Sequence, residues 1–216
     1  MTPAEVIERA ATSRYNNDYT ATHARRFGLC IEEVSRVLPA ATPILDVGWP
    51  TIFTDLLIER GYPVKNFDKD IREKWAGVDD GSLDAVFLME VVEHLKDPDG
   101  ASFDTFLHMG LQNALAEVRR VLKPDGYLFL TTPNQASYGS IKRLIHGGNP
   151  MLFSPHTREY TASEIEWWVG QAGLRVVERK TIACYEQADP IIVGAMNSIG
   201  ASLANREDTT VIWARK

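Results

Sequence analysis

Short apolar runs alternate with amphipathic stretches along most of this chain, and that alternation constrains the fold more than any other feature. The clearest apolar runs are residues 44–47, 83–89 and 127–131, and residues 64–67 are expected to form a further strand. Helical spacing of apolar residues follows the first run and recurs from Phe103 to Leu122. Strands that alternate with helices build a mostly parallel sheet covered on both faces. With further runs at 174–177 and 209–214, the pattern predicts an α/β fold of three layers, α/β/α.

Length and composition predict one domain over residues 1–216. Of these residues, 44% are hydrophobic, which is enough to bury one core. We expect a helical cap over residues 1–40, because Thr2-Pro3-Ala4-Glu5 has the order of a capping box and helical spacing follows it. Residues 135–160 are polar and rich in glycine and proline, without a clear period, which predicts a substrate lid within the domain.

The same sequence disfavours several classes of protein. No apolar run approaches the roughly 20 residues that span a bilayer, and the N-terminus lacks the regions of a signal peptide. We therefore expect a cytoplasmic protein without membrane contacts. The formal net charge of -6 argues against nucleic acid as a partner. Cys30 and Cys184 lie far apart, and no cluster of His, Cys or carboxylate residues has a recognisable ligand spacing, so we predict neither a disulfide nor a metal site.

Residues 44–52 point to a nucleotide-type cofactor. An apolar run into Asp46-Val47-Gly48, followed by an amphipathic stretch, is typical of the strand, turn and helix that hold a cofactor in α/β folds. Asp68 lies 22 positions after Asp46, where such folds place an acidic residue that binds a ribose. The turn continues as Trp49-Pro50 in place of glycines. This change argues against a dinucleotide, whose pyrophosphate needs close approach to the backbone.

A series of segments from residue 44 onward extends this pattern. They are Ile44–Gly48, Asp68, Leu83–Leu95, Val121–Leu128, Thr132–Asn134 and Ser154–Thr161, followed by the last apolar run. In this order and spacing they resemble class I S-adenosylmethionine-dependent methyltransferases of types 11 and 23. The resemblance implies a Rossmann-like fold, a seven-stranded sheet with a reversed C-terminal strand, and S-adenosylmethionine as the cofactor.

The resemblance also implies cofactor-binding roles at matching positions. Asp46 and Gly48 would lie beside the methionine moiety, Asp68 would hold the ribose hydroxyls, and Met89 and Glu90 would line the cofactor. Trp49 has two interpretations. It either stacks on the cofactor or fills the space that the missing small-residue turn leaves.

Catalytic and substrate roles are expected on two later segments. His94, in the Glu-His pair, and His156 are candidate general bases, because the acceptor must lose a proton when its nucleophile is protonated. Arg158 and Tyr160 precede a second capping-box sequence and are expected to form a wall for the substrate.

The segment between Asp68 and Leu83 departs from the family pattern. It is too short for the helix and extra strand that usually lie there, so we expect one edge strand to be missing, which leaves six. Residues 71–81 are expected to form one short helix and a loop. Asp79 or Asp80 is then the candidate for an adenine contact.

Two functions compete on this evidence. The first is a methyltransferase that acts on a small polar metabolite or a glycan precursor, most simply by O-methylation. The alternative is a non-catalytic binding or scaffold partner of the same fold, whose cofactor pocket is blocked by Trp49, Pro50 and Ile52. An apolar stretch from Ile191 to Met196 fits either a homodimer contact or packing within a lid.

Overall fold

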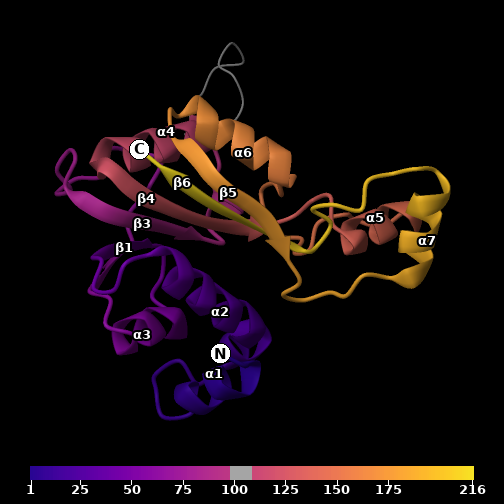
Figure 1. The fold of residues 1–216 in the computed structure, drawn as a ribbon, viewed down its shortest axis with the longest axis horizontal. Coiled ribbons are helices and arrows are strands. Elements are labelled where there is room, and N and C mark those ends of the chain that lie inside the picture. The colour runs from indigo at the N-terminus through magenta and orange to yellow at the C-terminus, as the bar shows by residue number, and fades with distance from the viewer. Residues whose placement is uncertain (98–108) are drawn as a thin grey trace.

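The computed structural model describes residues 1–97 and 109–216, and in that part of the chain six strands form one sheet (Figure 1). Four strands, in the order β2-β1-β3-β4, are parallel, and β6 is antiparallel to its neighbours β4 and β5. This confirms the predicted mostly parallel sheet with a reversed C-terminal strand. The strands are β1 (Ile44–Val47), β2 (Val64–Phe67), β3 (Leu83–Met89), β4 (Leu122–Pro133), β5 (Arg175–Ile182) and β6 (Thr209–Arg215).

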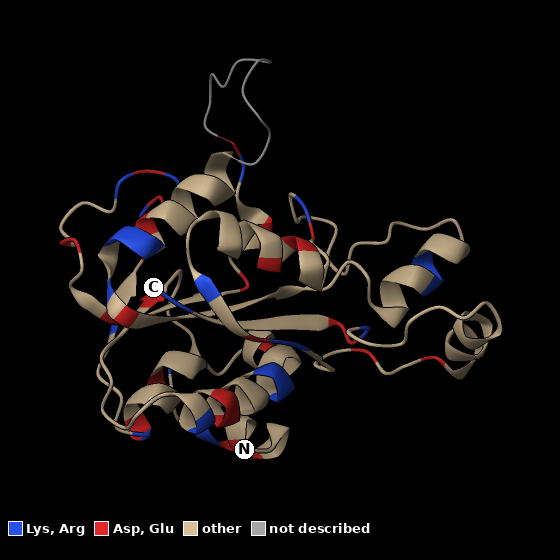
Figure 2. Ribbon diagram, turned by 45° about the horizontal axis from the view of Figure 1, so that its top comes forward, with Lys and Arg blue, Asp and Glu red and all other residues tan. Residues whose placement is uncertain are grey.

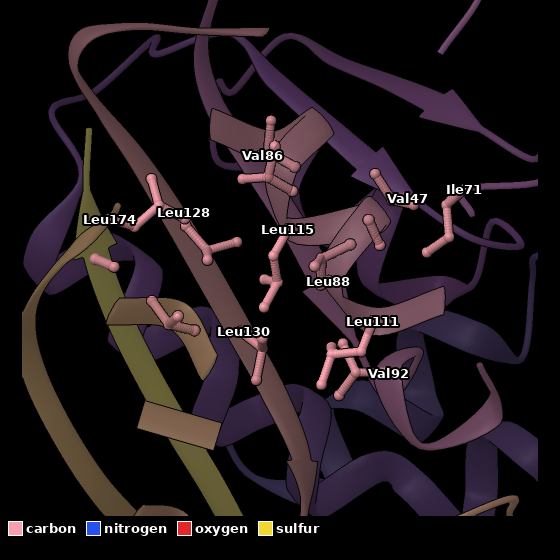
Figure 3. Packing of buried hydrophobic residues seen from close by; sticks show 14 of the residues in the cluster. Val47, Ile71, Val86, Leu88, Val92, Leu111, Leu115, Leu128, Leu130 and Leu174 are labelled. Carbon is pink, nitrogen blue, oxygen red and sulfur yellow. The ribbon is translucent and has the colours of Figure 1, made fainter. Parts of the chain in front are cut away.

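Helices cover both faces of this sheet, which confirms the three layers (Figure 1). Because successive side chains point to opposite faces of a strand, Val86 and Leu88 of β3 pack in one core and Ala85 and Phe87 in the other. Figure 3 shows the first core, where Leu115 of α4 lies among the strand side chains. One face carries α1 (Pro3–Ala10), α2 (Asp18–Val37) and α3 (Ile52–Glu59), and the other carries α4 (Met109–Val121) and α6 (Ala162–Gln171).

Local sequence signals set the helix starts. Thr2 caps α1 and Thr161 caps α6, each in the predicted capping box with a glutamate three residues later. α2 begins at Asp18, because the side chain of Asn17 accepts a hydrogen bond from the N–H of Thr20 at 2.9 Å. This long helix makes up half of the predicted N-terminal cap, residues 1–40.

The connection between β2 and β3 contains turns and no helix, so the short helix predicted within residues 71–81 is wrong. Trp75 is only 1% exposed there, and its ring stacks on Phe67 with 5.0 Å between centroids. The indole N–H donates to the carbonyl of Ile71 at 3.2 Å, and the backbone N–H donates to the carboxylate of Glu117 at 2.7 Å. One large side chain therefore covers this end of the sheet where a helix was expected.

The entry into β4 contains the predicted turn. Leu122 pairs with Leu83 and Tyr127 pairs with Ala85, so residues 123–126 bulge out of the ladder between them. The helix predicted from Phe103 to Leu122 is present as α4 from Met109. Its first predicted apolar positions, Phe103, Phe106 and Leu107, lie outside the described residues.

Two further helices pack together away from the sheet (Figure 1). They are α5 (Tyr138–Ile145), within the predicted lid, and α7 (Pro190–Ser198), in the insertion before β6. Their contact is a small cluster of Tyr138, Ile192 and Met196. A single 3₁₀ turn, η1 (Val92–His94), follows β3. None of the helices in residues 1–97 and 109–216 combines the length and apolar character needed to cross a membrane.

Candidate active site

A cavity of about 750 Å³ opens at the carboxyl ends of β1 and β3. Its volume is in the range of small-molecule sites in proteins. Three segments line it: the start of α2 with the residues before it, the loop from β1 into α3, and the residues that follow β3. The lining residues are Tyr15, Asn17, Tyr19, Thr20, Arg26, Phe27, Asp46, Val47, Gly48, Trp49, Pro50, Thr51, Phe53, Met89, Glu90, Val91, His94 and Leu95.

The β1 loop turns sharply at Gly48. Its φ of +118° is a conformation that residues with a side chain rarely adopt, and its N–H donates to the carbonyl of Phe67 at 2.9 Å. Trp49 follows with its side chain 87% exposed. Thr51 then caps α3 through a hydrogen bond from the N–H of Phe53. The loop therefore keeps the glycine conformation of a cofactor turn without the later glycines.

Asp46 lies buried beneath this loop. Its Oδ2 accepts hydrogen bonds from Thr54 Oγ1 at 3.0 Å and from Asn66 Nδ2 at 3.2 Å. Burial raises the pKa of Asp46 to about 6, although both hydrogen bonds act in the opposite direction. The carboxylate therefore keeps its charge near neutral pH at an energetic cost.

A buried ion pair closes the inner wall of the cavity. Arg26 Nη1 of α2 lies 3.0 Å from Glu90 Oε2, with side chains only 3% and 10% exposed. Glu90 adopts φ of +54°, which turns the chain just past β3. Among the described residues, neither Arg26 Nε nor Glu90 Oε1 has a hydrogen-bond partner. These two buried atoms are available to a ligand.

Aromatic and imidazole side chains extend this wall toward the segment after β5. Tyr19 OH accepts a hydrogen bond from Arg26 Nη2 at 3.1 Å. His23 Nδ1 lies 2.7 Å from Tyr185 OH. Burial and the nearby Arg26 lower the pKa of His23 to about 4, so its imidazole is neutral at physiological pH.

Two histidines meet beside the cavity. His94, at the end of η1, and His156 have ring centroids 4.8 Å apart at an interplanar angle of 81°. Burial, and next the charge of His156, lower the pKa of His94. His156 Nδ1 lies 2.7 Å from Glu159 Oε1. Glu93 beside them is 1% exposed, and burial raises its pKa well above the usual range.

The structure brings most of the predicted cofactor residues together. Met89 lines the cavity with five other predicted residues: Asp46, Gly48, Trp49, Glu90 and His94. Asp68 is exposed at the end of β2 and is not among the lining residues.

The predicted substrate residues lie outside the cavity lining. His156, a predicted base, is also outside the lining, and its ring contacts that of His94. Tyr160 is 2% exposed in the hydrophobic core, with Arg158 over its ring at 5.1 Å. Asp80, a predicted adenine contact, instead lies beside Arg120 of α4 at 2.5 Å.

Sequence reasoning missed Arg26 on the α2 side of the site. Arg26 was adjacent to Arg25 in the sequence and had the appearance of a solvated charge. One signal was present: His23, Arg26 and Cys30 recur at helical spacing on a buried stripe of α2. A cation within such a stripe indicates a buried partner.

Comparison with known families identifies the domain. The model of the family Methyltransf_23, a methyltransferase domain, matches residues 22–179. The chain belongs to this methyltransferase family. A search of curated proteins finds no match to this chain.

Solved structures similar to this methyltransferase have the same fold. A SAM dependent methyltransferase from Archaeoglobus fulgidus is 18% identical with a TM-score of 0.59, over 88% of this chain and 94% of the other. A possible histamine N-methyltransferase from Thermotoga maritima is 15% identical with a TM-score of 0.55, over 98% of this chain and 99% of the other. A chain of the complex between the Haloferax volcanii Trm112 methyltransferase activator and a putative methyltransferase is 15% identical with a TM-score of 0.54, over 98% and 97%.

Proposed function

We propose that this chain transfers a methyl group from S-adenosylmethionine to an oxygen of a small polar metabolite or a glycan precursor. The observation that carries the proposal is the open cavity at the carboxyl ends of β1 and β3, with Gly48 and Glu90 in its wall. Open α/β sheets bind ligands at this edge. Membership of the methyltransferase family supports the reaction class, and the name of the similar Archaeoglobus fulgidus protein supports the cofactor.

The residues of the cavity fit this cofactor. S-adenosylmethionine carries ammonium and sulfonium cations, and the cavity wall offers the carboxylates of Asp46 and Glu90 and the aromatic ring of Phe27. Glu90 Oε1 is a buried acceptor without a partner in the described chain. Asp68 does not line the cavity, but it directly follows Phe67, whose carbonyl accepts a hydrogen bond from the N–H of Gly48, and from there it would hold the ribose hydroxyls. When bound, the cofactor supplies an electrophilic methyl group.

The chain's own task is to hold the acceptor oxygen in line with that methyl group. Asn17, Tyr19 and Thr20 bring polar side chains to the α2 side of the cavity, where a polar acceptor could bind. The predicted bases for the acceptor proton are His94 and His156, and His94 is the one that lines the cavity.

Surface charge supports a small acceptor over nucleic acid. Lys and Arg are interspersed with Asp and Glu over the helices and loops in Figure 2, and the formal net charge of the chain is -6. Phosphate backbones bind to concentrated positive charge.

The scaffold alternative requires that the altered turn fills the cavity. Trp49 is 87% exposed, and Ile52 is 2% exposed within the packing of α3. Pro50 lies in the cavity wall. These placements leave the cavity open and favour an enzyme.

Titration calorimetry with S-adenosylmethionine and S-adenosylhomocysteine tests cofactor binding. We expect saturable heat from the wild-type protein and an affinity at least about 10-fold weaker in Gly48→Ala, because a side chain at this φ strains the loop by roughly 1–3 kcal/mol. Gly147→Ala is the matched control, since Gly147 also has positive φ, +73°, but no atom within 4 Å of an added Cβ. Absence of heat at millimolar cofactor contradicts the proposal.

A panel of small acceptors tests which kind of atom receives the methyl group. Release of S-adenosylhomocysteine would be measured with hydroxyl, amine and carbon acceptors, and the methylated atom located by NMR. We expect turnover with polar hydroxyl compounds. Transfer only to nitrogen or carbon would contradict O-methylation while leaving the cofactor assignment intact.

A further inference from the structure

The end of β3 and the segment before α6 meet in a fixed arrangement beside the cavity. The backbone N–H groups of Thr157 and Arg158 both donate to the carbonyl of Glu93, at 2.9 and 3.2 Å. The hydroxyl of Thr157 donates to the carbonyl of His94 at 3.4 Å. These bonds hold His156, one residue earlier in the chain, against η1.

Three metal-ligating side chains converge at this meeting point. Glu93, His94 and His156 each offer a ligand atom, and these atoms all lie within 4.8 Å of one another. With metal–ligand bonds of about 2.1 Å, ligand atoms on one tetrahedral ion lie roughly 3.4 Å apart. Since His94 is exposed, its ring can rotate to close the remaining gap.

The carboxylate of Glu93 is only half satisfied by the protein. Its Oε2 accepts a hydrogen bond from Thr132 Oγ1 at 2.9 Å. Within residues 1–97 and 109–216, Oε1 has no hydrogen-bond partner, although the residue is 1% exposed. A buried carboxylate oxygen without a donor is costly, and a bound cation would remove that cost.

His156 is held by a second carboxylate in the manner of a metal ligand. Its Nδ1 lies 2.7 Å from Oε1 of Glu159, whose side chain has no exposed surface. Glu159 is itself positioned by the backbone N–H groups of Leu152 and Phe153, at 2.8 to 3.2 Å. A carboxylate that accepts from Nδ1–H leaves the Nε2 lone pair for an ion, the arrangement that usually orients ligating histidines.

We propose that Glu93, His94 and His156 bind one divalent first-row transition-metal ion, with Glu159 as the residue that positions His156. Two imidazoles and one carboxylate suit zinc or iron, whereas magnesium and calcium prefer oxygen ligands. Three protein ligands leave a coordination position open. Because His94 also lines the cavity, the ion would face the space where an acceptor binds.

A bound ion would also restrict which acceptors the enzyme can methylate. This consequence rests on the proposed function. A hydroxyl bound to a divalent metal releases its proton to solvent at a much lower pH than the free hydroxyl. The acceptor would then be a compound whose hydroxyl can coordinate the ion. The ion, and not a free histidine, would activate the nucleophile.

Metal binding is tested without the cofactor, so that its result is independent of methyl transfer. Chelator-treated full-length protein would be dialysed against micromolar Zn²⁺ and its metal content measured, and Co²⁺ would be added as a spectroscopic probe. We expect one Zn²⁺ per chain and visible d–d absorption from Co²⁺. His94→Ala and His156→Ala should each abolish stoichiometric binding, and Glu159→Gln should weaken it about 10- to 100-fold.

His146→Ala is the matched control, because His146 is an exposed histidine at the end of α5 and should have no effect. Circular dichroism confirms that each variant is folded. His94 is exposed, so its replacement preserves the core and keeps the test decisive if His156→Ala fails to fold. Wild-type protein that binds no stoichiometric Zn²⁺, or binding that survives His94→Ala, overturns the proposal.

Discussion

At the scale of single residues, the site combines charges that the fold buries. Asp46 and Glu90 both line the cavity near the ends of strands, and burial opposes the negative charge of Asp46. Within residues 1–97 and 109–216, Asp46 accepts hydrogen bonds from Thr54 and Asn66 and forms no salt bridge. A cationic cofactor would supply the missing charge, so this residue should trade stability for binding.

Asp46→Asn tests this trade through pH. The pKa of Asp46 is about 6 in the folded chain and near 3.8 when unfolded, so the folded state holds the extra proton between these values. Wild-type stability should therefore fall by about 3 kcal/mol in total as pH rises from about 3 to 7, with most of the fall between the two pKa values. The stability of Asp46→Asn should not change with pH in this way, so this variant should be more stable than the wild type at pH 7. It should also bind the cofactor more weakly. Urea unfolding at several pH values measures the free energy of unfolding of both proteins. A stability difference independent of pH would contradict the assignment.

At the scale of elements, α5 and α7 form a unit whose contacts are largely its own. Ile192 and Met196 of α7 are buried against Tyr138 of α5, while Ile191 is 79% exposed. The unit contains part of the predicted lid, residues 135–160, and that function stays a prediction. So does a homodimer contact through this exposed apolar surface.

Ile192→Asp should separate α7 from α5 without unfolding the sheet. A buried charge in so small a cluster has no partner, and the cluster is distinct from the two cores on the faces of the sheet. We expect faster proteolysis near residues 183–205 and a nearly unchanged main unfolding transition. Ile191→Asp, at the exposed neighbour, should show neither effect. Loss of the main transition in Ile192→Asp would show that the unit is part of the global fold.

At the scale of the whole molecule, the six-stranded sheet depends on a shortened connection between β2 and β3. Trp75 covers the sheet there, joins the core on the α4 face and bonds to Glu117 of α4. The side chain of Trp75 packs on the sheet while its backbone N–H bonds to Glu117, so this one residue links an edge of the sheet to its covering helix.

Trp75→Ala should destabilise the whole domain by about 3–5 kcal/mol, the usual cost of removing a large buried aromatic side chain. Urea unfolding followed by circular dichroism measures the change. Trp167→Ala is the matched control, because Trp167 is 55% exposed on α6 and should shift stability far less. Equal effects of the two substitutions would mean that Trp75 does not anchor the connection.

The sequence by itself determined the features that depend on near neighbours. β1, β2 and β3 begin and end where the sequence predicts; for β1 and β3 the reason is that burial of a strand requires nearly continuous apolar residues. Both capping boxes formed because their partners are three residues apart. Asp46, Gly48 and Glu90 were predicted from motifs at strand ends, where chain order decides position.

Only the tertiary structure decided which distant residues meet. Arg26 and Glu90 come from a helix and a strand end far apart in sequence, so no spacing signalled their ion pair. His156 joins Glu93 and His94 only because the segment before α6 crosses η1, which is why the sequence predicted no metal site. Trp75 replaced a predicted helix because packing against Phe67 outweighed local preference. Contacts between distant segments depend on how the chain folds back on itself, so local sequence patterns do not predict them.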